Sequence, residues 1–127
     1  MLNQYDENRP YITKDGSIIR ELMHPDSHGN IAQSLAEAVI EPGRHTRLHL
    51  HRTSEELYHV TRGSGEMRLA DKTLSLRTGD TICIRPGTPH QVFNSSSEML
   101  HILCCCAPAY SHEDTVLLPD ETGMVGE

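Results

Sequence analysis

Apolar and polar residues alternate along a series of short segments in this chain of 127 residues, and turns rich in glycine and proline separate the segments. A period of two is typical of strands with one buried face, whereas an amphipathic helix needs a period near 3.6. The pattern therefore predicts an all-β chain, a barrel or sandwich of short strands. The predicted central strands cover residues 46–50, 57–61, 65–70, 72–76, 81–84, 91–94 and 99–106.

The two ends of the chain are less regular. Short strands are predicted over residues 11–13 and 17–22, on either side of the turn signal Lys14-Asp15-Gly16, and residues 24–30 read as a loop. Residues 31–40 are ambiguous, because alanines and Glu37 favour a helix while the alternation also fits a strand. The periodicity is lost from Pro108 onward, which predicts a C-terminal tail.

The predicted organisation is one domain in three parts: N-terminal strands and loop over 1–30, a barrel core over 31–107 and a tail over 108–127. The net charge is −7, and the sequence has no basic run. Both observations argue against a nucleic acid or an anionic membrane as partner, so a small molecule is the expected ligand. The start of the chain resembles no signal peptide, and no apolar run approaches the roughly 20 residues of a membrane span. A cytoplasmic location is expected.

Four cysteines occur, and Cys104, Cys105 and Cys106 are consecutive. Neighbours on a strand point to opposite faces, so this spacing does not suit a disulfide framework. The three residues are interpreted as part of a buried strand of reduced thiols, with a redox role or a second metal site as the alternative.

The most informative chemistry is the sequence His49-Leu50-His51, followed by Glu56. On a strand, a separation of two puts both imidazoles on the same face, where they can share an ion. Glu56 follows a polar turn, so a returning strand can bring its carboxylate to that face, and His90, after a Pro/Gly-rich bend, is the natural fourth ligand. Imidazole and carboxylate together suit a first-row divalent cation.

These residues resemble the two sequence motifs of the cupin superfamily. The first motif, G-x5-H-x-H-x4-E-x6-G, matches at every fixed position from Gly43 to Gly63. The second, G-x5-P-x-G-x2-H-x3-N, matches at each fixed position except one, since Arg85 stands where the motif has proline. Its matching positions are Gly79, Gly87, His90 and Asn94.

The resemblance implies a double-stranded β-helix, or jelly-roll barrel, commonly a homodimer, and it supports the strand interpretation of residues 31–40. It also implies a divalent transition metal, which the residues leave open among manganese, iron, zinc, nickel, cobalt and copper. The metal ligands would be His49, His51, Glu56 and His90. Four protein ligands would leave two places open on a six-coordinate ion.

Two further residues are candidates for catalysis. Tyr58 shares the inward face of Glu56, where its hydroxyl would serve as an acid or hydrogen-bond donor; the alternative is an aromatic wall of the barrel. Arg47 shares the parity of His49 and would clamp an anionic substrate, or else is a solvated arginine paired with Glu41 or Glu55. Side chains alternate along the strand that contains Glu56, which places His59 on its outer face.

Single-domain cupins include dioxygenases, decarboxylases, isomerases, lyases and binding proteins, so the fold does not select one activity. The principal hypothesis is a metal-dependent enzyme that acts on a small polar or organic-acid metabolite. The alternative is a binding or sensor protein in which the metal anchors a ligand without turnover. A purely structural metal is disfavoured, because protein ligands normally close a structural zinc site.

Overall fold

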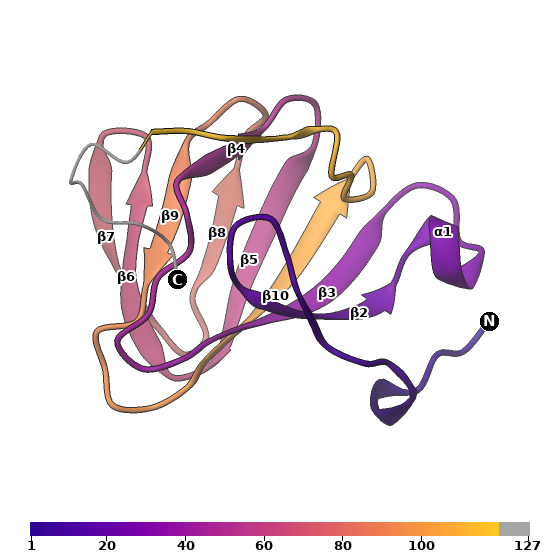
Figure 1. Ribbon diagram of the computed structural model, residues 1–127, viewed down its shortest axis with the longest axis horizontal. Helices are drawn as coiled ribbons and strands as arrows, with labels where there is room; N and C mark the ends of the chain where they lie inside the picture. The colour runs from indigo at the N-terminus through magenta and orange to yellow at the C-terminus, as the bar shows by residue number, and fades with distance from the viewer. Residues whose placement is uncertain (120–127) are drawn as a thin grey trace.

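Two antiparallel sheets face each other and enclose the core (Figure 1). The computed structural model describes residues 1–119. One sheet has the strand order β1-β2-β3-β10-β5-β8, and the other has the order β11-β4-β9-β6-β7. The elements are η1 (Tyr5–Glu7), β1 (Tyr11–Ile12), β2 (Ile18–Met23), α1 (Pro25–His28), β3 (Ser34–Ile40), β4 (His49–His51), β5 (Glu55–Arg62), β6 (Ser64–Leu69), β7 (Lys72–Arg77), β8 (Thr81–Ile84), β9 (His90–Phe93), β10 (Leu100–Ala107) and β11 (Thr115–Leu117).

The alternation along the strands fills the space between the sheets. In β5, Glu56, Tyr58 and Val60 are buried while their neighbours are exposed. Val60 and Met67 are fully buried and belong to one continuous hydrophobic cluster. The predicted all-β jelly-roll fold is confirmed, and so is the strand over the ambiguous segment, since β3 pairs along its whole length with β10.

A tight turn between β5 and β6 depends on Gly63. Its φ is +86°, a conformation that side chains rarely adopt, and a Cβ there would lie 2.5 Å from the carbonyl oxygen of Met99. Glycine is therefore required both by the backbone conformation and by the close approach of the chain before β10.

The first ligand strand is shorter than predicted. Residues 46–50 were expected to form a strand, but β4 begins only at His49. The Arg47 amide donates to the carbonyl of Asp15, 2.7 Å away, instead of joining a neighbouring strand. The N-terminal turn thus ends the ladder, and the side-chain alternation that placed Arg47 beside His49 does not extend back to it.

The segments that flank the barrel core also contribute strands. β2 pairs with β3, and β11 pairs with β4, so residues from the predicted tail belong to the second sheet. The loop predicted over residues 24–30 contains the single turn α1. The last part of the predicted tail, residues 120–127, lies outside the described residues. Within residues 1–119 no helix has the length and apolar character that crossing a bilayer requires.

Asp114 ties the C-terminal segment to the turn between β4 and β5. Its carboxylate accepts hydrogen bonds from the Thr53 amide and hydroxyl at 2.9 and 2.8 Å and from the Ser54 amide at 3.1 Å. Burial opposes ionisation, but these hydrogen bonds outweigh it and lower the pKa of Asp114.

We expect Asp114→Ala to lower the free energy of unfolding by about 1–2 kcal/mol, because two backbone donors lose a charged acceptor. Since the pKa of Asp114 is lowered by folding, its contribution is present above the unfolded pKa of about 3.9 and is lost as the pH falls through the folded value. Urea unfolding at pH 7 and at pH 3 measures both effects. Glu113→Ala is the control, and an equal loss of stability in the control would contradict this role.

Candidate metal centre

Three buried histidines meet between the two strands at the centre of the second sheet. His49 and His51 lie on β4, and His49 is paired with His90 of β9. One ring nitrogen of each histidine lies within 4.8 Å of the other two, an arrangement that could hold a metal ion. The exposed fractions of these side chains are 2%, 4% and 0%, so an ion at this point would be removed from bulk water.

Backbone carbonyls fix the orientation of two of the rings. The Nδ1 atom of His49 is 2.7 Å from the carbonyl oxygen of Arg47, and the Nδ1 atom of His90 is 2.9 Å from that of Thr88. A carbonyl oxygen only accepts, so each Nδ1 carries the proton and donates it. Each Nε2 therefore presents a lone pair to the centre of the cluster.

The third ring is held by the C-terminal segment. The Nδ1 atom of His51 is 3.0 Å from the Thr115 hydroxyl, which itself donates to the Ser111 carbonyl at 2.9 Å. Because the Thr115 proton is donated to Ser111, the hydroxyl oxygen accepts from Nδ1 of His51. The Nε2 atom of the same ring donates to the Glu56 carboxylate at 3.1 Å, and its lone pair becomes available to an ion once that proton leaves. Hydrogen bonds of this kind fix the tautomer of metal-binding histidines.

Glu56 brings a carboxylate to the same point. Its Oε1 atom is 3.1 Å from Nε2 of His51 and 3.5 Å from Nε2 of His90. Its Oε2 atom accepts a hydrogen bond from the buried thiol of Cys106 at 3.2 Å. Burial raises the pKa of Glu56, but the hydrogen bond from His51 and the nearby His90 ring prevail and lower it, so the group is ionised at neutral pH.

The donor set is unfavourable without a cation. Burial and the neighbouring His90 lower the pKa of His49 to about 4, so this ring is neutral at pH 7. The Nε2 atom of His90 is fully buried and has no hydrogen-bond partner among the described residues. Three converging imidazoles and a carboxylate are the donor types that a first-row divalent ion prefers, and the residues present fit such an ion.

Two of the three histidines, His49 and His51, line a cavity between the sheets together with Glu56. Its empty volume, including the open mouth, is about 640 Å³. Most of the wall is apolar, and two tyrosines pack edge-on to ligand rings: Tyr58 against His90 and Tyr110 against His51. The apolar wall consists of Ile19, Ala36, Ala38, Ile40, Val92 and Ile102.

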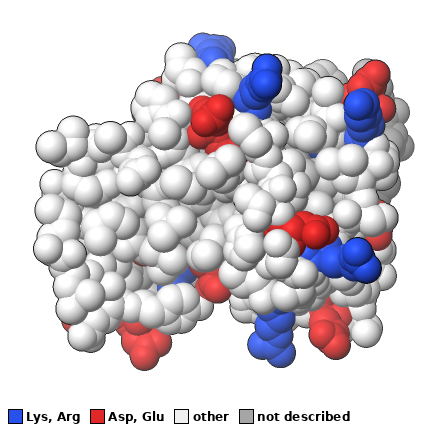
Figure 2. All heavy atoms as spheres, turned by 180° about the vertical axis from the view of Figure 1, so that it is seen from behind, with Lys and Arg blue, Asp and Glu red and all other residues white. Residues whose placement is uncertain are grey.

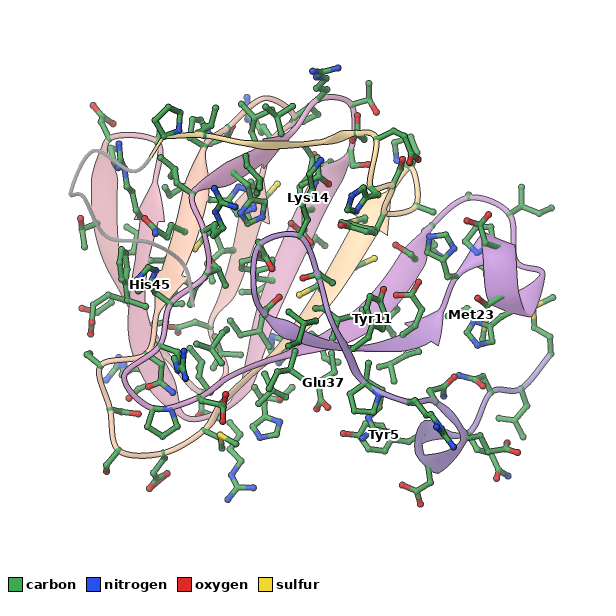
Figure 3. The ribbon with its side chains drawn as sticks, viewed as in Figure 1. Tyr5, Tyr11, Lys14, Met23, Glu37 and His45 are labelled. Carbon is green, nitrogen blue, oxygen red and sulfur yellow. The ribbon has the colours of Figure 1, made fainter. Side chains whose placement is uncertain are left out.

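The N-terminal loop crosses the cavity. Figure 3 shows Lys14 on this loop, which passes in front of β5. Lys14 donates to the Thr115 carbonyl at 2.8 Å, which joins the loop to β11. Asp15, next to it, lines the cavity with its Oδ2 atom 3.5 Å from Nε2 of His49.

The catalytic candidates of the sequence lie in different places. Tyr58 is buried and lines the cavity, and burial together with the Glu56 charge raises its pKa well above 10, so the phenol keeps its proton. Arg47 is exposed and is not part of the cavity wall. His59 is exposed and contacts the Thr81 hydroxyl, in keeping with its expected outward face.

Sequence reasoning did not find several residues of the site. Cys104 and Cys106 both line the cavity, and the alternation continuing from Ile102 along β10 could have indicated this. Asp15 and Tyr110 come from loops far away in the chain, for which no periodic pattern exists. All four cysteines are free thiols, in keeping with the reduced thiols expected at Cys104, Cys105 and Cys106.

The comparison with known families decides what kind of protein carries this site. The profile of the Cupin domain family matches residues 36–106, which include all three histidines and Glu56. The chain belongs to the cupin family. It is 52% identical over 115 residues to the uncharacterized protein MJ1618 of Methanocaldococcus jannaschii, a match that covers 91% of this chain and 92% of that protein.

One further curated protein and one solved structure are similar to this chain. Protein SchB of Streptomyces halstedii is 34% identical over 116 residues, covering 87% of this chain and 83% of SchB. The polyketide cyclase RemF of Streptomyces resistomycificus has a similar structure, with a TM-score of 0.79 at 20% identity, covering 95% of this chain and 89% of RemF. At that identity the likeness to RemF concerns the fold.

We expect His49→Ala to abolish stable metal binding, because the remaining ligands lose one of three converging nitrogens. After dialysis against buffer with zinc and then without it, metal analysis should find about one equivalent in the wild type and less than about one-tenth in the variant. The exposed His59→Ala is the control and should bind like the wild type. Full occupancy of the His49 variant would contradict the assignment of this ligand.

Proposed function

We propose that this cupin is a metal-dependent enzyme acting on a small, largely apolar metabolite that binds the ion through one or two oxygen atoms. The observation that supports the proposal is that His49, His51 and Glu56 line a cavity whose other walls are mostly apolar, with His90 grouped beside these two histidines. A metal that served structure alone would be enclosed by its protein ligands.

The cavity wall favours a substrate without a strongly anionic group at its far end. Neither lysine nor arginine is among the described residues that line it, whereas Asp15, Glu21 and Glu56 are. A dicarboxylate would meet carboxylates and apolar side chains there, and Arg47 is not placed to clamp it. Among the polar or organic-acid metabolites expected from the sequence, this lining favours a neutral molecule with carbonyl or hydroxyl oxygens.

The residues around the donors suggest how a bound substrate is handled. The Tyr58 phenol, protonated at neutral pH, can donate a hydrogen bond or a proton to an oxygen of the substrate. The Cys106 thiol holds the Glu56 carboxylate in place through its second oxygen. An ion held by these ligands would supply Lewis-acid stabilisation of negative charge on that oxygen.

The test compares turnover and binding across two groups of compounds. With metal-loaded protein, aromatic or alicyclic ketones and phenols should bind or react, whereas two- to four-carbon dicarboxylates should do neither. Tyr58→Phe should reduce kcat at least about a hundredfold if the phenol transfers a proton, while Tyr5→Phe, outside the cavity, should leave it unchanged.

Saturable binding of these compounds without turnover, under air and under nitrogen, would replace the enzyme by the binding or sensor protein that the sequence also allowed. A preference for dicarboxylates would overturn the substrate class. Either result leaves the metal centre itself to be judged by metal analysis.

We also propose that the protein acts in the cytoplasm, where its four free thiols remain reduced.

We further propose that two copies of the chain associate through the outer face of the first sheet. The registers of β8, β5, β10 and β3 place Cys83, Leu57, Cys105 and Leu35 in one row across that face. Leu57 is 42% and Leu35 is 36% exposed, which leaves an apolar strip uncovered. On the side of the molecule turned away in Figure 1, charged side chains are sparse over the half that carries the N-terminal elements (Figure 2).

The dimer can be tested by placing a charge in the row. Leu57→Asp should shift the sedimentation coefficient from that of a dimer to that of a 14.2 kDa monomer, because the strip can no longer be buried between copies. Ile31→Asp changes a residue that is 93% exposed and lies outside the row, and it should remain dimeric. A monomeric wild type, or a dimeric Leu57 variant, would contradict this surface.

A further inference from the structure

Asp15 is held rigidly by the loop between β1 and β2. Its Oδ1 atom accepts hydrogen bonds from the Ser17 amide at 3.0 Å, the Ser17 hydroxyl at 2.7 Å and the Thr13 hydroxyl at 2.7 Å. One carboxylate oxygen is thus fully occupied by the loop itself. The other, Oδ2, is directed at the histidines, and only 13% of the side chain is exposed.

The contact of the Asp15 Oδ2 atom with His49 is unfavourable when no cation lies between them. The two atoms, Oδ2 and Nε2, are 3.5 Å apart. Because the Nδ1 proton of His49 is donated to the Arg47 carbonyl, Nε2 has no hydrogen to give, and two electron-rich atoms face each other in a buried place. The backbone reinforces the approach, since the Arg47 amide donates to the Asp15 carbonyl at 2.7 Å.

We propose that Asp15 is a fifth protein ligand of the metal ion, an inference that rests on the metal centre proposed above. Ligands about 2.1 Å from an ion, at right angles to each other, lie about 3.0 Å apart. The 3.5 Å between Asp15 and His49 equals the distance between Glu56 and His90, so Asp15 is as near to one histidine as the expected carboxylate ligand is to another.

Charge also favours a second carboxylate. Three neutral imidazoles and Glu56 leave a divalent ion with a net charge of +1, which is costly beside apolar walls. The negative charge of the Asp15 carboxylate would cancel the remaining positive charge of the ion and its other ligands. The fully buried His90 Nε2, which has no hydrogen-bond partner among residues 1–119, independently indicates that a cation belongs at this point.

The assignment changes the chemistry available to a substrate. The ligand set becomes three nitrogens and two carboxylates, and a six-coordinate ion keeps one open place instead of two. Asp15 also lies outside residues 36–106, the part of the chain that matches the family profile. This carboxylate is therefore contributed by the N-terminal loop of this chain and not by the matched barrel core.

The test measures the metal alone. Zn²⁺ affinity is determined by competition with a chromophoric chelator for the wild type, Asp15→Asn and the control Asp71→Asn, whose side chain lies in an exposed turn. Asp15→Asn should bind Zn²⁺ at least about tenfold more weakly, while the control should match the wild type. The visible spectrum of the Co²⁺-loaded protein should change in Asp15→Asn only, because a ligand is replaced.

The outcomes separate this inference from the proposed function. Wild-type affinity and an unchanged Co²⁺ spectrum in Asp15→Asn would overturn Asp15 as a ligand while leaving the histidine centre intact. A wild type that binds no metal would overturn the centre itself. If Asp15→Asn does not fold, as judged by circular dichroism, Ser17→Ala replaces it. Ser17→Ala removes the hydroxyl that donates to Oδ1 of Asp15, so it should weaken Zn²⁺ binding. An unchanged Zn²⁺ affinity of this variant would count against the inference.

Discussion

The structure depends on keeping three imidazole rings and a carboxylate together at one buried point. Like charges and lone pairs repel strongly where water cannot screen them, so this arrangement is a local cost to the folded chain unless a cation balances it. The two sheets hold it in place. β4 and β9 are paired at His49 and His90, and the Glu56 carboxylate reaches across from the opposite sheet. The packing of the barrel core thus offsets the free-energy cost of holding these donors in positions suited to an ion.

The same constraint explains why the supports are so specific. Two rings are fixed by carbonyls only two residues earlier in the chain, so each ligand strand orients its own histidine. The third ring depends on Thr115, and the Glu56 carboxylate depends on Cys106. These partners have no place in a sequence motif, yet loss of any one would free a donor to turn away from the common point.

The alternation of side chains along single strands predicts part of this site. The other residues reach it through contacts between segments that are far apart in the sequence. The separation of two between His49 and His51, and the parity of Glu56 with Tyr58, are properties of single strands and could be deduced from the sequence. The failure of the same logic at Arg47 has a definite cause, because the Asp15 backbone ends the strand there. Asp15 and Tyr110 reach the cavity from loops whose paths depend on the whole fold. A pattern with period two carries no information about them.

The supports of the centre come from nearly opposite ends of the chain, with Asp15 near its beginning and Thr115 near its end. During synthesis the histidines and Glu56 leave the ribosome before the strand that orients His51. A nascent chain that has just completed β10 therefore lacks the partner of that ring, and contacts of such large sequence separation form slowly. An ion bound at that stage would meet a His51 ring that Thr115 does not yet orient.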